Sequence, residues 1–449
     1  MPEPTQFTSQ WMGLSRAYFG DQTLWEMSLP GSHDTLTYDL GGTVSRSEKG
    51  SWLFRLLEAL APHSVEHEIE DFLIGQAKTQ TESLTRQLDA GLRFLDLRVS
   101  WEGPGDLDWY GVHFVITRQR FTSYLTELRA WLEAHPTEMV VAWISYHGST
   151  CQKDQYPGAT PAAQAALGAN IAAQLGHLLV DPATDGEPWS TPYDHYQALG
   201  KQLVLYISDS EHFAVPGALD ACIDASGRGG IDNQTGADVM QAARGFEWEL
   251  GLFEQGTELY QEHKANGTLM LRSGATSGTE QLIKNQALLR FLSPELLKLL
   301  GLHPCQDCRD LFDFPPETQN LLQCPGDLRA LGRMTNFYLQ RSMNHALDQI
   351  AAGHPGYRMP GAMYLDGVLA DGTYDTGISD ASPTSRYAYV GTMLKSATAH
   401  LSCNHSGSGY PLTCHQVDEA IAALLAAAPY DDFSAPEYGR QEDWPPIGR

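Results

Sequence analysis

The stretch Ser28-Leu29-Pro30-Gly31-Ser32-His33-Asp34-Thr35 places a histidine and a carboxylate directly after a Pro-Gly pair. It follows a short apolar run from Leu24 to Leu29, and Pro30 and Gly31 are residues that interrupt strands. The pattern predicts a strand over 24–29 that opens into a functional loop, because α/β barrels keep their chemistry at the carboxyl ends of strands. The alternative is a structural role, in which Ser32 or Asp34 caps a following helix.

Strand-like and helix-like segments alternate along the rest of the chain. Strands are predicted at 92–99, 110–116, 139–144, 202–207, 268–271 and 362–366, and helices at 84–90, 122–134 and 161–180. This order is typical of an α/β barrel. Residues 148–160 and 210–245 are predicted loop insertions, and a helix over 416–428 precedes an acidic, proline-rich tail.

Several strands carry ionisable side chains where apolar ones are expected. Asp96 and Arg98 share one face of the strand over 92–99, His113 lies within an apolar run, and Asp366 ends the strand over 362–366. Charges that face the interior of a barrel are costly unless they are paired or used. The structural alternatives are an ion pair between Asp96 and Arg98 and a hydrogen-bonded core histidine at position 113.

The composition limits the classes of partner. The 449 residues, 42% of them hydrophobic, can bury one elaborated barrel or two ordinary domains. The formal charge of −26 argues against nucleic acid and against stable non-specific docking on an anionic bilayer. Membrane contact is therefore expected to be local and peripheral. Residues 51–61 are either a helix over the barrel mouth or an interfacial anchor.

The N-terminal residues lack the pattern of a signal peptide, and no apolar stretch is long enough to span a bilayer. We expect a soluble, cytoplasmic protein, with secretion as the minority alternative. The odd number of cysteines, 7, favours a reducing compartment. His303, Cys305, Cys308 and Cys324 could form a zinc site, but a disulfide or free thiols fit a single CxxC better.

Four ordered stretches resemble the X domain of phosphatidylinositol-specific phospholipase C, in the variety found in small X-domain-containing proteins. They are LPGSHDTLTY (29–38), TRQLDAGLRFLDLRV (85–99), GVHFV with LTELRAWLEAHPTEMVV (111–115 and 125–141) and YLDGVLADG (364–372). The resemblance implies a distorted TIM (β/α)8-type barrel over residues 11–376, with insertions at about 41–85, 148–160, 210–245 and 300–330. Residues 377–449 would then be a C-terminal helical extension and tail, packed on the barrel or trailing from it.

The resemblance also implies roles for individual residues. His33 would be the general base that takes the proton of the inositol 2-hydroxyl, with Asp366 holding its imidazole. His113, paired with Asp34, would be the general acid that protonates the departing diacylglycerol oxygen. Displacement at a phosphodiester needs a base and an acid on opposite sides of phosphorus. Arg98 would stabilise the phosphate oxygens, and Asp96, Asp209 and Arg272 are candidates for binding the substrate.

The predicted reaction converts phosphatidylinositol into diacylglycerol and inositol 1,2-cyclic phosphate. No cofactor is expected: Arg98 occupies a place where calcium-dependent members carry a carboxylate, so the pattern resembles the metal-independent bacterial type. The partners implied are a phosphatidylinositol-type lipid at a membrane surface and no nucleic acid, and we expect a monomer. Two alternatives remain, a metal-dependent glycerophosphodiester- or sphingomyelin-type phosphodiesterase with magnesium on Asp34 and Asp96, and a non-catalytic phosphoinositide-binding protein.

Overall fold

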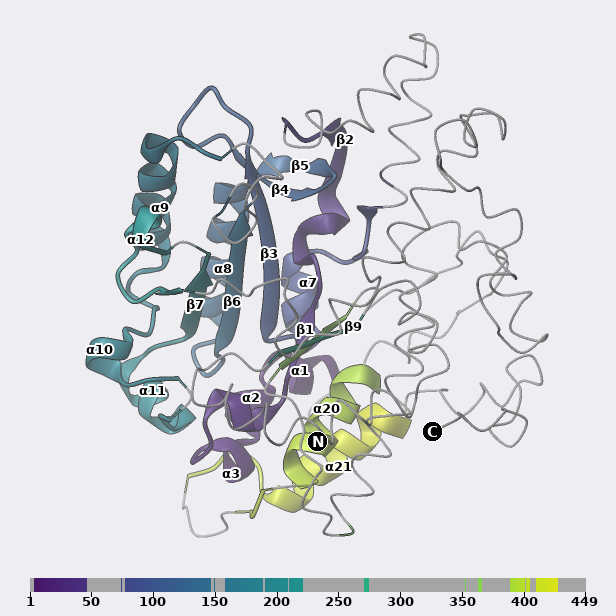
Figure 1. Ribbon diagram of the computed structural model, residues 1–449. Coiled ribbons are helices and arrows are strands. Elements are labelled where there is room, and N and C mark those ends of the chain that lie inside the picture. Colours follow the sequence, from purple (N-terminus) through teal and green to yellow (C-terminus); the bar gives the residue numbers. More distant parts are fainter. Residues whose placement is uncertain are drawn as a thin grey trace, which may run out of the picture.

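A computed structural model describes residues 4–46, 74, 77–146, 149, 158–188, 190–208, 210–220, 270–273, 352, 362–365, 388–399, 401–403 and 409–426. Within them the fold is α/β, a mixed ten-stranded sheet with helices around it (Figure 1). The strands are β1 Leu29–Ser32, β2 Leu40–Val44, β3 Phe94–Trp101, β4 Trp109–His113, β5 Val115–Arg120, β6 Val140–Tyr146, β7 Leu203–Ile207, β8 Leu219–Asp220, β9 Met270–Ser273 and β10 Ala362–Leu365.

The helices cover the sheet from two sides. Those longer than one turn and a half are α1 Pro4–Ser9, α7 Leu84–Asp89, α8 Phe121–Ala134, α9 Pro161–Leu175, α11 Tyr193–Leu199, α20 Ala388–Ala399 and α21 Cys414–Ala426. The short ones are α2 Trp11–Leu14, α3 Arg16–Phe19, η1 Leu24–Met27, η2 Thr35–Asp39, α10 Pro182–Asp185 and α12 Ser210–Phe213. Among the helices described, none combines the length and apolar character needed to cross a bilayer.

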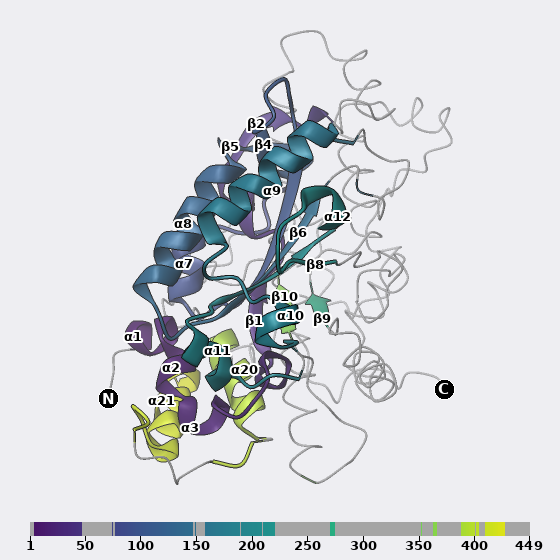
Figure 2. The same cartoon turned by 90° about the vertical axis from the view of Figure 1, so that its left-hand side faces the viewer.

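The parallel part of the sheet runs in the order β9-β10-β1-β3-β6-β7-β8. Its alternating side chains separate two cores. Leu95, Leu97 and Val99 pack with α7, α8 and α9, which lie together over one face of the sheet (Figure 2). Phe94 belongs to the other core, which β1 and β6 share with the N-terminal and C-terminal helices. Closure of the sheet into a barrel is not among the described pairings.

Strand β3 changes partner along its length. Its beginning pairs in parallel with β1, through Gly31 opposite Phe94 and Ser32 opposite Leu95. Its end pairs antiparallel with β4, from Val99 opposite Gly111 to Trp101 opposite Trp109. Because β1 stops at Ser32, β4 takes its place beside β3 and runs back toward the loop that follows β1. This exchange brings the end of β4 to the residues after Ser32.

The predicted strand over 24–29 is wrong. Residues Leu24–Met27 form the helix η1, started by a capping box between Thr23 and Glu26, and the strand β1 begins at Leu29. Pro30 and Gly31 lie inside β1 rather than ending it. The Pro30 carbonyl still accepts from the Arg93 N–H, at 2.7 Å, and the Gly31 N–H donates to the Tyr389 hydroxyl, at 3.2 Å. Tertiary partners thus outweigh the local preference of Pro-Gly.

The single strand predicted over 110–116 is also wrong. The chain reverses at Phe114, whose φ is +61°, so that β4 and β5 form an antiparallel pair with His113 opposite Val115. β2 pairs antiparallel with β5. The expectation of an all-parallel sheet therefore fails on this side, and His113 lies at the end of a strand instead of its middle.

Most other predicted elements are confirmed within one to three residues. They correspond to α7, α8, β3, β6, β7, β9, β10 and α21. The helix predicted over 161–180 ends earlier, at Leu175, and part of the loop insertion predicted over 210–245 contains α12 and β8. The segment 51–61, the cysteines at 305, 308 and 324, and the tail beyond 429 lie outside the described residues.

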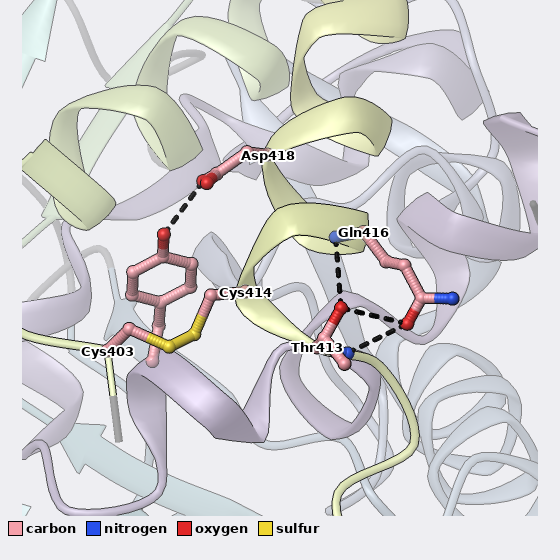
Figure 3. The surroundings of a disulfide bond; sticks show 6 residues. Cys403, Thr413, Cys414, Gln416 and Asp418 are labelled. Carbon is pink, nitrogen blue, oxygen red and sulfur yellow. Dashed lines mark hydrogen bonds between the residues drawn. A yellow bond between two sulfur atoms is a disulfide. The ribbon is translucent and has the colours of Figure 1, made fainter. Parts of the chain in front are cut away.

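The C-terminal helices belong to the same core as the strands. Helix α20 contacts β1, and α21 contacts α1. Figure 3 shows how α21 begins: the Thr413 N–H and hydroxyl donate to Gln416 Oε1, and a disulfide joins Cys414 to Cys403. This pair was not predicted. Residues 388–426 are thus held to the body of the fold wherever they are described.

Candidate active site

Five ionisable side chains meet where β1 and β4 exchange places beside β3. His33 and Asp34 follow β1, Asp96 and Arg98 project from one face of β3, and His113 ends β4. Leu95 and Leu97 take the opposite face, toward the helices. All five are buried except Arg98, whose side chain is 20% exposed. The strand exchange in the fold therefore concentrates two imidazoles, two carboxylates and one guanidinium in one place.

Asp34 lies at the centre of this cluster. Its Oδ2 is 3.4 Å from His33 Nε2 and 3.4 Å from His113 Nδ1, and its Oδ1 is 2.7 Å from Arg98 Nε. Neither carboxylate oxygen has a hydrogen bond of good geometry, so the group is held by charge. The Asp34 carboxylate therefore places one negative charge beside both imidazoles.

The Arg98 guanidinium contacts three groups at once. Its Nη2 lies 2.7 Å from His33 Nε2 and 3.1 Å from Asp96 Oδ2, while Nε donates to Asp96 Oδ2 at 3.2 Å. A guanidinium only donates, so His33 Nε2 is the acceptor and carries a lone pair. The His33 Nε2 atom is thus turned toward the arginine.

Asp96 has no exposure to solvent and makes its contacts inside the cluster. It accepts from the Asp34 N–H at 3.1 Å as well as from Arg98. Burial raises the pKa of the Asp96 carboxyl above its usual value, and the nearby Asp34 charge adds to the rise, although Arg98 opposes it. The contact with the Asp34 N–H supports the left-handed backbone of that residue, whose φ is +47°.

His113 is fixed by the chain on two sides. Its Nδ1 lies 2.7 Å from the Ala77 carbonyl oxygen, and the Phe114 ring stacks on the imidazole with centroids 4.8 Å apart. Because a carbonyl only accepts, Nδ1 carries the proton in that contact. Nε2 is then the nitrogen that remains to exchange a proton with a bound molecule.

Comparisons with known proteins agree with this geometry. The family model described as PI-PLC X matches residues 71–159, a range that contains Asp96, Arg98 and His113. Residues 71–159 thus match the PI-PLC X domain. The chain is 35% identical over 150 residues to PI-PLC X domain-containing protein 1 of Mus musculus, covering 33% of this chain and 42% of that protein. The Homo sapiens protein of the same name is 36% identical over 132 residues, covering 29% and 40%.

The match to these X-domain proteins thus spans about two fifths of their length. Solved structures give a looser likeness over more of the chain. The phosphatidylinositol-specific phospholipase C from Listeria monocytogenes is 15% identical with a TM-score of 0.45, covering 87% of this chain and 98% of that one. The F249X mutant of the Staphylococcus aureus enzyme is 12% identical with a TM-score of 0.48, covering 88% and 99%.

Some X-domain enzymes use calcium, so the cluster was compared with the needs of a metal ion. His33, Asp34 and Asp96 each offer a ligand atom within 4.8 Å of the others. However, Arg98 nitrogens lie 2.7 Å from His33 Nε2, 2.7 Å from Asp34 and 3.1 Å from Asp96. A permanent cation therefore already contacts each of these three potential ligand groups.

The side chains of the other three predicted site residues are not described by the structure. Asp366 and Asp209 lie outside the described residues, and Arg272 is placed by its backbone alone, on β9 opposite Tyr364. The prediction missed Ala77, Thr79 and Gln80, which contact the two histidines. No residue pattern signals them, because all three contacts use a backbone carbonyl, that of Ala77 or that of His33, and every residue has one.

Proposed function

We propose that this X-domain protein is a phosphodiesterase that cleaves phosphatidylinositol to diacylglycerol and inositol 1,2-cyclic phosphate. One observation carries the proposal. The Asp34 carboxylate lies between His33 and His113 while Arg98 reaches His33, Asp34 and Asp96. Two imidazoles and a permanently charged guanidinium can supply the base, the acid and the charge stabilisation that a phosphodiester displacement needs.

In the proposed reaction, the phosphate draws the partly exposed Arg98 guanidinium, which frees His33 Nε2. His33 takes the proton of the inositol 2-hydroxyl as that oxygen forms a bond to phosphorus. The bond from phosphorus to the diacylglycerol oxygen breaks, and protonated His113 gives that oxygen its Nε2 proton. Asp34 stabilises the imidazolium charge on whichever ring carries it. Arg98 stabilises the charge that builds on the non-bridging oxygens.

Several finer parts belong to the same proposal. Asp366 would accept from the Nδ1–H that a His33 with a free Nε2 must carry, and Asp209 and Arg272 would bind inositol hydroxyls. Asp96 would act on the substrate through Arg98, which it contacts. The parallel strand order supports a barrel of the (β/α)8 type. Arg98 contacts His33, Asp34 and Asp96, the residues that could otherwise bind a metal ion, and this supports a reaction without calcium.

The test is phosphorus NMR of the purified protein with phosphatidylinositol micelles, with and without excess chelator. We expect a cyclic inositol phosphate signal in both samples. His33→Ala and His113→Ala should each reduce turnover by about 10²–10⁴-fold, the usual contribution of a general acid or base. Near-normal turnover by His33→Ala would overturn the mechanism, and loss of the signal with chelator would favour the metal-dependent alternative.

A further inference from the structure

A short segment, Ala77–Gln80, crosses the site between the two histidines; we call it the strap. It precedes α7 in the chain and is buried at Ala77, Thr79 and Gln80. It does not belong to the sheet, and its side chains take no part in the proton transfers proposed above. Its contacts nevertheless go to His113 on one side and to the His33 loop on the other.

The contacts on the His33 side are the most numerous. The Gln80 Nε2 donates to the His33 carbonyl at 2.8 Å, and the Thr79 hydroxyl donates to the same oxygen at 3.2 Å. A carbonyl accepts only, so the amide orientation of Gln80 follows from its partner. Two buried donors on one carbonyl fix the peptide that links His33 to Asp34.

A second set of bonds fixes the next peptide. The Thr37 hydroxyl donates to the Asp34 carbonyl at 2.9 Å and accepts from the Gln80 N–H at 3.0 Å and the Thr79 N–H at 3.2 Å. The peptides on both sides of Asp34 are therefore tied, directly or through Thr37, to the strap. Asp34 has a φ of +47°, a conformation that residues other than glycine rarely adopt.

On the other side, the strap fixes His113. The Ala77 carbonyl lies 2.7 Å from His113 Nδ1, nearer than the Asp34 Oδ2 at 3.4 Å. This contact selects the tautomer that leaves Nε2 facing away from the strap. One four-residue segment thus sets the backbone of the proposed base and the ring of the proposed acid.

We propose that the strap fixes the positions of His33 and His113 relative to Asp34. Gln80 is the residue of the strap on which this positioning depends. The inference rests on the proposed function for its kinetic consequence, but the geometry stands without it. Removal of the Gln80 donor leaves the His33 carbonyl with only the longer bond from the Thr79 hydroxyl, at 3.2 Å, and so loosens the peptide that precedes the left-handed Asp34. A displacement of this kind slows chemistry more than it weakens binding.

The experiment compares Gln80→Met with Gln87→Met. Gln87 is an equally buried glutamine whose Nε2 donates to the carbonyls of Thr35, at 2.9 Å, and Glu82, at 2.7 Å, and to neither histidine. We expect Gln80→Met to lower kcat on phosphatidylinositol by about 10- to 100-fold with KM nearly unchanged. Gln87→Met should keep kcat, with a similar loss in thermal stability. Equal kcat for the two variants, at a temperature where both are folded, would overturn the proposal.

Two further measurements keep the result interpretable. Thr79→Val retains the shape of the side chain and removes only the hydroxyl donor, so it should lower kcat in the same direction if Gln80→Met fails to fold. Nitrogen NMR of the histidine rings needs no turnover: we expect a protonated Nδ1 on neutral His113 and ring signals that move in Gln80→Met but not in Gln87→Met. If the wild type turns over no inositol lipid, the proposed function fails, and unmoved ring signals would separately overturn the strap.

Discussion

At the scale of single residues, Arg98 decides the chemistry of the site. A planar guanidinium can point different nitrogens at several partners, as Arg98 does toward His33, Asp34 and Asp96. A lysine carries the same charge on one nitrogen and cannot reach all three together. The site therefore depends on the shape of the cation as well as on its charge.

Arg98→Lys should lower kcat/KM on phosphatidylinositol by about 10²–10³-fold, the usual cost of removing a donor to developing negative charge. Initial rates from phosphorus NMR measure this directly. Arg118→Lys is the control, because Arg118 lies on β5 with a 65% exposed side chain and pairs with Asp39 at 3.6 Å. A rate for Arg98→Lys within a factor of two of the wild type would contradict the role given to the guanidinium.

Asp96 should give stability an unusual pH dependence. Burial raises its pKa in the folded protein, so its contribution to stability is complete below the unfolded pKa of about 3.9 and is lost as pH rises through the folded value. Asp96→Asn lacks this titration. We therefore expect urea unfolding to show the variant gaining stability relative to the wild type as pH rises from about 4 to 7.

Asp185 provides a control of opposite sign. Burial raises its pKa, but the Asp181 N–H and Lys201 outweigh burial, so the net pKa is lowered. Its contribution is present above the unfolded pKa and is lost as pH falls. Asp185→Asn should accordingly lose stability relative to the wild type as pH rises from about 2 to 5, the range around and below the unfolded pKa of about 3.9. Parallel trends for the two variants would show that the sign argument for Asp96 is wrong.

The residues of the cluster were largely predictable, and the contacts that orient them were not. His33, Asp34, Asp96, Arg98 and His113 carry chemistry in their side chains and occur in ordered motifs. The pairing of His33 with Arg98, and the Ala77 carbonyl that orients His113, depend on tertiary structure. Every residue has a backbone carbonyl, so contacts made by this group cannot be predicted from the residue types of a single sequence.

At the scale of elements, hydrophobic periodicity identified the helices and strands that bury one apolar face. The helix α8 and the strands β3, β6 and β7 have strong apolar patterns and were found within one or two residues. The errors fall where backbone conformation decides. Pro30 and Gly31 stay in β1 because β3, β10 and Tyr389 engage it, and Phe114 adopts a positive φ without being glycine or asparagine.

A buried ion pair ties the N-terminal helices to the sheet. Arg93 and Glu138 precede β3 and β6, are fully buried and lie 2.7 Å apart. Glu138 also accepts from the Gly13 N–H at 3.0 Å, and the Arg93 guanidinium lies over the Trp131 ring at 4.8 Å. The pair thus links α2, α8 and two strands at the end of the sheet opposite to the cluster of His33, Asp34, Asp96, Arg98 and His113.

Glu138→Gln should destabilise the fold by about 3–5 kcal/mol, because it leaves Arg93 buried without its counter-charge. Urea denaturation measures the loss. Glu82→Gln is the control: Glu82 pairs with Arg86, whose side chain is 66% exposed, and such pairs contribute about 1 kcal/mol or less. Equal losses in the two variants would show that the buried pair has no special weight, while kcat of the folded Glu138→Gln protein should be unchanged.

At the scale of the whole molecule, the N-terminal helices and the C-terminal helices α20 and α21 hold the strand that leads to the site. Tyr389 on α20 accepts from the Gly31 N–H, two residues before His33, and Tyr18 near the N-terminus donates to Asp418 on α21 at 2.8 Å. The residues 388–426 that are described therefore act as part of the scaffold of β1. Under the proposed function, this assembly, with its formal charge of −26, approaches a lipid surface.

That charge sets the last prediction, which concerns binding to vesicles. The substrate class proposed here lies in membranes that are themselves anionic, with a surface potential of about −30 mV. Each net negative charge brought within a Debye length of that surface weakens binding roughly threefold, and the Debye length is about 10 Å at 0.1 M salt. We expect vesicle affinity to fall as the anionic lipid fraction rises, and to recover in high salt. Sedimentation with phosphatidylcholine vesicles of increasing phosphatidylserine content measures this without turnover. A steep rise in affinity with phosphatidylserine would contradict the argument from net charge and would point to a local basic surface instead.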